Sequence, residues 1–261
     1  MERLGARVVV MAIIMVFIKE TPGRHLATAE DMVKSAPGVK EIAATVMRTL
    51  PRSPALMFTI AGGVAYHFIL GATAFDQLWF VQERGFDRAE IAQYTGWVGI
   101  TGGILGNLFG GIGSDWFTRK TGLGRPMFLF WIMLILSPIN IAYRLVDGDS
   151  WWFWAGVFCG YFQLGAFYGP TFSTVQELVP PQVRATVVAF YLLLLNLIGI
   201  GFGVTFAGVA IDKLIALGVD QPYTIALLGF TVVSFISIPC FLIAGKRFER
   251  DKAQLYKNLA T

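Results

Sequence analysis

Six long apolar stretches constrain this chain more than any other feature of its sequence. Each holds at least about 18 mostly apolar residues, enough for a helix to cross a hydrocarbon core of roughly 30 Å. Because unpaired backbone polar groups are too costly in lipid, spans of this length fold as α-helices. The predicted spans are residues 55–75, 91–112, 126–143, 151–175, 185–211 and 223–244. The sequence therefore predicts an all-α membrane protein.

The composition agrees with a membrane protein and gives no sign of an enzyme. Only 15% of the residues are charged, against about 25% in soluble domains. The sequence contains no H-E-x-x-H, G-x-S-x-G or phosphate-binding G-K-[ST] motif, so we expect no enzyme, no cofactor and no metal site. Cys159 and Cys240 fall in separate spans and are predicted to be packing residues. No basic and aromatic groove suggests a nucleic-acid partner.

The chain divides into four predicted regions. Residues 1–18 contain a short apolar run without a cleavage site, and we interpret them as the end of a truncated transmembrane helix. Residues 19–54 are predicted to be a cytoplasmic linker with an amphipathic helix over 39–50. Residues 55–244 form the predicted six-helix bundle, and 245–261 a soluble cytoplasmic tail.

The basic residues predict the orientation of the bundle. If residues 19–54 are cytoplasmic, the segments on that side contain fifteen Lys and Arg, and the three opposite loops contain four. By the positive-inside rule, the C-terminus is then cytoplasmic. We expect a multi-pass protein of a plasma membrane, specifically a bacterial inner membrane. The segments on the basic side are 19–54, 114–125, 176–184 and 245–261.

The second span carries a row of glycines that ends near an acid. Glycines 99, 103, 106, 110 and 113 alternate spacings of four and three, which puts them on one helix face. A face without side chains allows close approach of another helix in lipid. An aspartate at the bilayer centre costs about 2.5 to 3.5 kcal/mol, so we expect Asp115 at the membrane surface. We predict that the helix ends there and a basic hairpin follows.

Polar side chains within the spans are candidates for the wall of a substrate cavity. Intramembrane polar groups usually face protein or a water-filled cavity. His67 could contact substrate, carry a proton or form a fold-stabilising interhelical hydrogen bond. Helix breaks are predicted at Pro138, at Gly169–Pro170 and at Pro239. At Pro138, the freed backbone groups can be satisfied by Ser137, Asn140 or water. The candidate cavity residues are Tyr66, His67, Tyr161, Gln163, Tyr168 and Asn196.

A short motif recurs three spans later. Gly111 is followed by Asp115, and Gly208 by Asp212, at the same spacing. Since three crossings reverse direction, the two copies would end on opposite sides of the membrane. This arrangement is typical of a three-plus-three inverted repeat in a transporter half.

Three segments resemble the major facilitator superfamily, specifically its Spinster-like members. Gly111 to Asp115, followed by Arg119, Lys120 and Arg125, resembles the superfamily's cytoplasmic hairpin motif. Residues 176–214, with Pro180-Pro181 and an Asn-Leu-Ile-Gly run, resemble the region joining helices ten and eleven of Spinster-like transporters. Residues 19–24 resemble the segment after helix six. The resemblance implies the C-terminal half of such a transporter, with helices 7–12 and the end of helix 6.

The resemblance also implies a function and partners. Such proteins move organic solutes, in some members lysolipids or sphingoid lipids, by alternating access between two six-helix halves. We therefore expect a secondary, ion-coupled transporter of a small or lipid-like solute, working in a bilayer with a missing N-terminal half or a second copy. The alternative is a regulatory or dimerising half-transporter without transport of its own. We predict gating by Gly111 and by a latch of Asp115, Arg119 and Arg184 that closes the cytoplasmic side in the outward-open state.

Overall fold

A computed structural model describes residues 50–260 of the chain. The predicted helix end at 1–18 and nearly all of the predicted linker at 19–54 lie outside the described residues. The described residues all belong to one compact unit.

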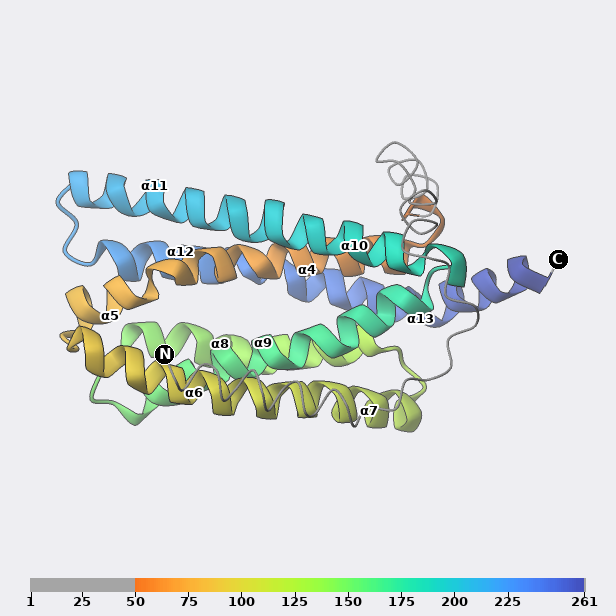
Figure 1. The fold of residues 1–261 in the computed structure, drawn as a ribbon, viewed down its shortest axis with the longest axis horizontal. Coiled ribbons are helices and arrows are strands. Elements are labelled where there is room, and N and C mark those ends of the chain that lie inside the picture. The colour runs from red at the N-terminus through yellow and green to blue at the C-terminus, as the bar shows by residue number, and fades with distance from the viewer. Residues whose placement is uncertain (1–49, 261) are drawn as a thin grey trace, which may run out of the picture. The chain divides into compact units, whose positions relative to one another are not determined.

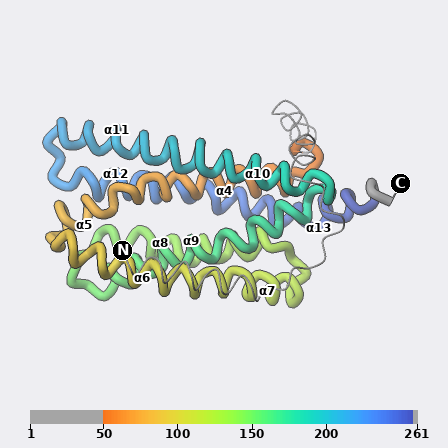
Figure 2. The backbone as a smooth tube through the Cα atoms, in the orientation of Figure 1, coloured from red at the N-terminus to blue at the C-terminus, as the bar shows by residue number. Residues whose placement is uncertain are grey.

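Six helical rods make up the described residues, and no strand occurs among residues 50–260 (Figures 1 and 2). A short turn, η1 (Leu50–Arg52), precedes them. The first rod is α4 (Pro54–Ala72) with the turn η2 (Thr73–Phe75) and α5 (Asp76–Arg84), and the second is α6 (Arg88–Leu108) with the π-helical turn η3 (Phe109–Gly113) and α7 (Ser114–Thr121). The third rod is α8 (Arg125–Leu145) and the fourth is α9 (Trp151–Glu177). After the turn η4 (Pro181–Val183), the fifth rod is α10 (Arg184–Leu194) with the π-helical turn η5 (Leu195–Gly201) and α11 (Phe202–Ala216), and the sixth is α12 (Pro222–Ser234) with α13 (Ser237–Ala260). The predicted all-α fold with six crossings is confirmed.

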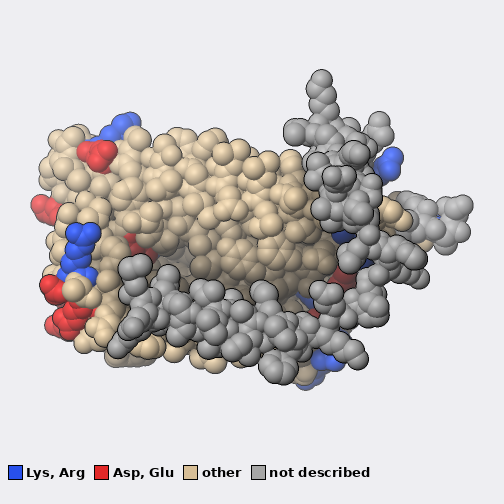
Figure 3. Space-filling model, in the orientation of Figure 1, with Lys and Arg blue, Asp and Glu red and all other residues tan. Residues whose placement is uncertain are grey.

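The rods have the length and surface of membrane spans. Four helical stretches are long and apolar enough to cross a bilayer by length and composition: Pro54–Arg84, Arg125–Leu145, Pro181–Ala216 and Pro222–Lys257. The rods of α6 and α9 are not in this set. In the face drawn in Figure 3, charged side chains lie toward two ends with a broad uncharged band between them. The chain is an integral, multi-pass membrane protein.

Polar caps and prolines set where the helices begin. The side chain of Ser53 accepts a hydrogen bond from the backbone N–H of Leu56, and Pro54 fits the first helical position. At α6, Asp87 accepts from the N–H groups of Glu90 and Ala89. These two bonds favour the charged form and lower the pKa of Asp87 below its ordinary value. The charge also suits the positive end of the helix.

The helix breaks predicted at the internal prolines do not occur at those residues. α8 continues through Pro138, and the hydroxyl of Ser137 donates to the freed carbonyl of Leu134 at 2.8 Å, as predicted. α9 continues through Pro170. The break in the last rod falls at residues 235–236, before the first turn of α13, which contains Pro239. A proline is tolerated where its missing N–H needs no helical partner.

The helix of the glycine row extends past its predicted end at Asp115. It continues as α7 to Thr121, because residues 114–121 contain no helix breaker. Gly122 then ends it with a φ of 70° and an N–H that donates to the carbonyl of Thr118 at 2.9 Å. This left-handed residue after the last turn is a common glycine C-cap.

The predicted boundary at residue 244 does not separate two elements. α13 runs from Ser237 to Ala260 without interruption, so the tail is a helical continuation of the last span. Its Asp251 is buried and accepts hydrogen bonds from the hydroxyl of Ser53 at 3.0 Å and the N–H of Ala55 at 2.8 Å. The tail therefore caps the first helix of the bundle.

Replacing Asp251 with alanine is expected to lower the free energy of unfolding by about 1 to 2 kcal/mol, the usual cost of losing a helix cap. Glu249 is an exposed acid on the same helix, so Glu249→Ala serves as the matched control and should change little. Denaturant unfolding of the detergent-solubilised chain measures both. Equal effects would show that the cap contributes nothing specific.

The packing confirms a three-plus-three inverted repeat. The first rod of the chain, α4, packs mainly against the fifth and sixth rods, while α9, the fourth, packs against the second and third. The first rod of each triplet thus packs against the second and third rods of the other triplet. The π-helical turns η3 and η5 occupy the second rod of each triplet, and α7 and the end of α11 lie at opposite ends of the bundle (Figure 1).

The glycine row packs against α9 except at Gly103 and at Gly113, where a methyl group would meet Phe128 of α8. A methyl group on Gly106 would overlap the carbonyl oxygen of Phe162, and one on Gly110 would lie 2.5 Å from that of Ala166. At Gly103 it would meet nothing within 4 Å, whereas Gly102 faces α9 instead. The close helix–helix approach is confirmed, but the contact face follows 3.6 residues per turn and leaves out Gly103.

Candidate functional site

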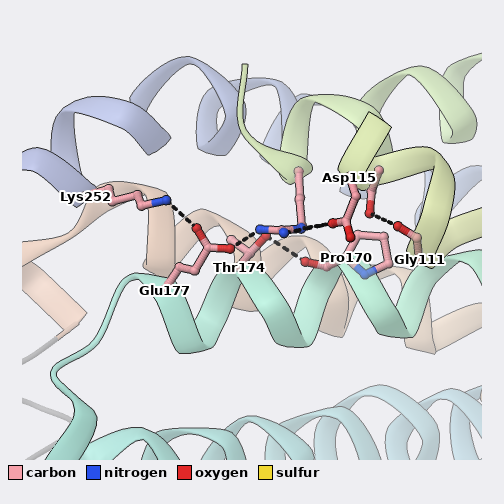
Figure 4. Close-up of polar contacts among 8 residues, drawn as sticks. Gly111, Asp115, Pro170, Thr174, Glu177 and Lys252 are labelled. Atoms are coloured by element: carbon pink, nitrogen blue, oxygen red, sulfur yellow. Dashed lines mark hydrogen bonds and ion pairs between the residues drawn. The ribbon is translucent and has the colours of Figure 1, made fainter. Parts of the chain in front are cut away.

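A chain of four charged side chains joins four rods at the α7 end of the bundle (Figure 4). Arg125 donates to Oδ1 of Asp115 at 2.8 Å and also pairs with Oε1 of Glu177. The second oxygen of Glu177 accepts from Lys252 at 2.6 Å. The two carboxylates and two cations therefore alternate, so each charge has an opposite neighbour.

The local structure explains why these side chains meet. Asp115 lies in the first turn of α7 and Arg125 begins α8, so the short turn between the two helices places them together. Glu177 is the last residue of α9. Lys252 reaches it because α13 extends beyond the last span. The side chains of Arg125 and Glu177 are 19% and 25% exposed, so their pair is less screened by water than the pair with the exposed Asp115.

The structure pairs Asp115 with Arg125 rather than with the predicted latch residues. Within residues 50–260, no ion pair joins Asp115 to Arg119 or Arg184. Arg119 is exposed on α7, and Arg184 begins α10 with its Nε buried and without a hydrogen-bond partner in the described chain. A latch of Asp115, Arg119 and Arg184 in the outward-open state stays a prediction.

Gly111, the first residue of the predicted motif, has no packing constraint here. A methyl group at this position would meet nothing within 4 Å. Its carbonyl accepts a hydrogen bond from the hydroxyl of Ser114 at 3.1 Å, within the π-helical turn. π-helical turns are often found at functional sites, so a gating role for Gly111 stays a prediction.

A cavity of about 420 Å³ lies inside the bundle, between α4, α5, α8, α9 and α12. Its size is in the usual range for a small-molecule site. The wall combines aromatic and aliphatic side chains with amides, hydroxyls and two charged groups. The polar and aromatic lining residues are Tyr66, Thr73, Asp76, Gln77, Phe80, Asn140, Tyr143, Arg144, Tyr161, Gln163, Thr231 and Ser234.

Three of the six predicted cavity residues line this space: Tyr66, Tyr161 and Gln163. The amide oxygen of Gln163 accepts from Asn140 at 2.7 Å, which joins α9 to α8 across the cavity wall. Asn196 lies elsewhere, with an exposed side chain that donates to the carbonyl of Leu192 on its own helix. Substrate contacts by any of these residues stay predictions.

His67 and Tyr168 meet in the core beside the cavity. His67 is 1% exposed, and its Nε2 lies 3.3 Å from the hydroxyl of Tyr168 on α9. Its Nδ1 lies 2.8 Å from the carbonyl of Gly63 one turn earlier. A methyl group on Gly199 would overlap the His67 side chain, so the π-helical turn η5 packs directly on it. This geometry agrees with the predicted interhelical hydrogen bond.

The cavity wall also contains a charged pair that the sequence patterns do not predict. Arg144, near the end of α8, is 1% exposed and donates to Oδ1 of Asp76 at 3.2 Å. The planar guanidinium also lies over the rings of Trp79 and Tyr143, at 5.0 and 4.8 Å from their centroids. Both charged residues directly follow apolar windows, and that position is the one signal in the sequence for this pair.

Further polar contacts fix α5 against the ends of α8 and α12. Glu83 accepts from the N–H groups of Tyr223 and Thr224 at the start of α12, at 2.7 and 2.8 Å. Arg84 donates to the carbonyl of Arg144 at 2.5 Å. Trp79 is fully buried and donates its indole N–H to the hydroxyl of Thr224 at 2.7 Å. This end of the bundle is therefore joined across three rods.

The family model of the Major Facilitator Superfamily matches residues 4–204. The chain belongs to the Major Facilitator Superfamily. An MFS-type efflux pump of Mycolicibacterium smegmatis is 26% identical over 232 residues, covering 83% of this chain and 51% of the pump. The chain thus spans about half the length of this curated relative.

Two solved structures of a superfamily member show the same fold. Both are of a bacterial homologue of the human lysosomal transporter Spinster, in inward-facing conformations. The unoccupied form is 19% identical with a TM-score of 0.68 over 94% of this chain and 57% of that one; the occupied form is 20% identical with a TM-score of 0.63 over 95% and 57%. The predicted superfamily and Spinster-like fold are confirmed. A superfamily of transporters also supports the expectation that the chain is not an enzyme.

Proposed function

We propose that this chain is one lobe of a secondary transporter, which moves a small organic or lipid-like solute by alternating access and is driven by an ion gradient. The superfamily and the relative described as an efflux pump support membrane transport. The lobe works against a second six-helix lobe, which is an N-terminal half or a second copy of the chain. The cavity contributes part of the solute pathway.

The observation that carries this proposal is the joining of the bundle at both ends. At the α7 end, the pairs of Asp115, Arg125, Glu177 and Lys252 connect four rods. At the α5 end, the Asp76–Arg144 pair and its neighbours do the same. Alternating access is largely a rigid-body rocking of one lobe against another. A lobe whose helices are joined to one another at both ends can rotate as a rigid body without changing the shape of its cavity.

In this proposal the α7 end faces the cytoplasm, with the C-terminus inside, and the membrane is a bacterial inner membrane. Basic residues gather at this end, where they support the positive-inside orientation. They are Arg119, Lys120, Arg125, Arg184, Lys246, Arg247, Arg250, Lys252 and Lys257.

Interrupting the coding region in its host tests the proposal. We expect altered accumulation of at least one solute in a panel of neutral, anionic and cationic dyes and radiolabelled metabolites, restored by the wild-type chain. Unchanged accumulation across the panel, with the chain recovered in a complex with another transporter, would contradict it and support the regulatory half-transporter.

Arg125→Gln is expected to slow transport of the affected solute at least about fivefold, since coupling energies between conformational elements are about 1 to 3 kcal/mol. The variant leaves Asp115 and Glu177 without their shared cation. Lys120→Gln removes an exposed cation from the same hairpin and is the matched control. Initial rates of solute movement in the complemented strain, at equal membrane levels of protein, measure both. Equal rates for the two variants would remove the network from the mechanism.

A further inference from the structure

The charged pair in the cavity wall is accessible on one side only. Asp76 and Arg144 are the charged groups among the described residues that line the cavity. The side chain of Asp76 is 20% exposed, while that of Arg144 is 1% exposed. The guanidinium is covered by two aromatic rings, and its Nε is buried without a partner. A ligand in the cavity therefore meets the carboxylate before the guanidinium.

The carboxylate of Asp76 has room for a second cation. Its Oδ1 is paired with Arg144, and no group among residues 50–260 donates to its Oδ2. The same chain shows a carboxylate between two cations at Glu177, where one oxygen pairs with Arg125 and the other with Lys252. A second positive group at Asp76 would repeat that arrangement inside the cavity.

The rest of the wall suits the body of an organic cation. Four aromatic residues line the cavity: Tyr66, Phe80, Tyr143 and Tyr161. Aromatic faces attract cations, and such cages recognise quaternary ammonium groups. Ile69, Leu70, Val157 and Leu164 supply apolar surface. The amides and hydroxyls add hydrogen-bond partners that can fix a ligand's orientation.

We propose that the cavity binds a small organic cation, whose positive group lies against the free oxygen of Asp76 within the aromatic wall. The inference rests on the proposed transport function and names the class of solute for it. Arg144 then acts as a positioning residue, which holds the carboxylate at the cavity edge and does not contact the ligand.

Two probes of matched shape and opposite charge test this inference. Benzyltrimethylammonium and phenylmethanesulfonate share a benzyl body and a tetrahedral head. Binding is measured by equilibrium dialysis with the full chain in phosphatidylcholine nanodiscs. We expect saturable binding of the cation and weaker binding of the sulfonate. Asp76→Asn should weaken cation binding at least about tenfold, a change of 1.4 kcal/mol.

Three further variants keep the test decisive. Asp212→Asn changes an exposed aspartate outside the cavity and should bind the cation like the wild type. Asp76→Asn/Arg144→Gln removes both charges together, so the cavity stays neutral; it should still lose cation binding. If neither Asp76 variant folds, Tyr161→Leu removes the half-exposed ring from the wall and should weaken cation binding several-fold.

The inference is overturned if the cation does not bind saturably, if the sulfonate binds more tightly, or if the folded Asp76 variants bind the cation like the wild type. If only Tyr161→Leu can be tested, unchanged binding overturns it. Dialysis requires no gradient or flux, so it is independent of the transport assay. Altered solute accumulation without cation binding would overturn this inference alone, and cation binding with unaltered accumulation would overturn the transport proposal.

Discussion

Arg144→Gln is expected to lower the free energy of unfolding by about 3 to 5 kcal/mol, the cost of breaking a buried ion pair from one side. The variant leaves the carboxylate of Asp76 in the cavity wall without its counter-charge. It also removes a guanidinium that packs on Trp79 and Tyr143. Reversible unfolding of the chain in detergent micelles, followed by tryptophan fluorescence, measures the change.

The double variant Asp76→Asn/Arg144→Gln separates the charge effect from the loss of packing. Because it leaves no uncompensated charge, we expect it to recover much of the loss, by about 1 to 3 kcal/mol of coupling between the contacting sites. Arg88→Gln, at an exposed arginine at the start of α6, should change stability by less than about 0.5 kcal/mol. Additive effects of Asp76→Asn and Arg144→Gln would show that the pair contributes no coupling energy.

Gly106→Ala is the second substitution with a large expected effect. The new methyl group would overlap the backbone carbonyl of Phe162 on α9, so the two helices must move apart. Overpacking typically costs about 1 to 3 kcal/mol, and here the obstacle is backbone, which cannot change rotamer. We expect a loss at the upper end of that range. The same detergent unfolding experiment measures it.

Gly103→Ala is the matched control on the same helix. Its methyl group would meet nothing within 4 Å, and alanine is favoured over glycine in a helix by up to about 1 kcal/mol. We expect this variant to be as stable as the wild type or more stable. Equal losses at the two positions would mean that the close contact between α6 and α9 does not determine stability.

Much of the fold could be predicted because the bilayer restricts the alternatives. The apolar stretches predicted all six rods, and the spacing of the glycines predicted a close contact face that faces α9 except at Gly103 and Gly113. The predicted end of the helix at Asp115 is wrong, because a charged residue does not by itself terminate a helix. The charge of Asp115 limits how deep this residue can lie in the bilayer. The helix ends only at Gly122, which adopts a positive φ.

The candidate site could be predicted only in part. Tyr66, Tyr161 and Gln163 line the cavity because polar groups within a span point toward protein. The amide of Asn196 donates to the carbonyl of Leu192 on its own helix, so it needs no hydrogen-bond partner inside the bundle. The pairing of Asp115 with Arg125 instead of Arg119 depends on the turn after α7, whose geometry is not visible in the charges alone.

By itself, the sequence determined that this chain crosses a membrane as six helices, since long apolar runs leave the backbone no other way to pair its polar groups. It also determined where glycine allows close packing. Only the tertiary structure decided which charges meet: Asp76 with Arg144 from rods one and three, and Glu177 with Lys252 from rods four and six. Each pair joins two rods of the same triplet, and only the packing of the rods brings together these residues, which are about 70 positions apart in the chain.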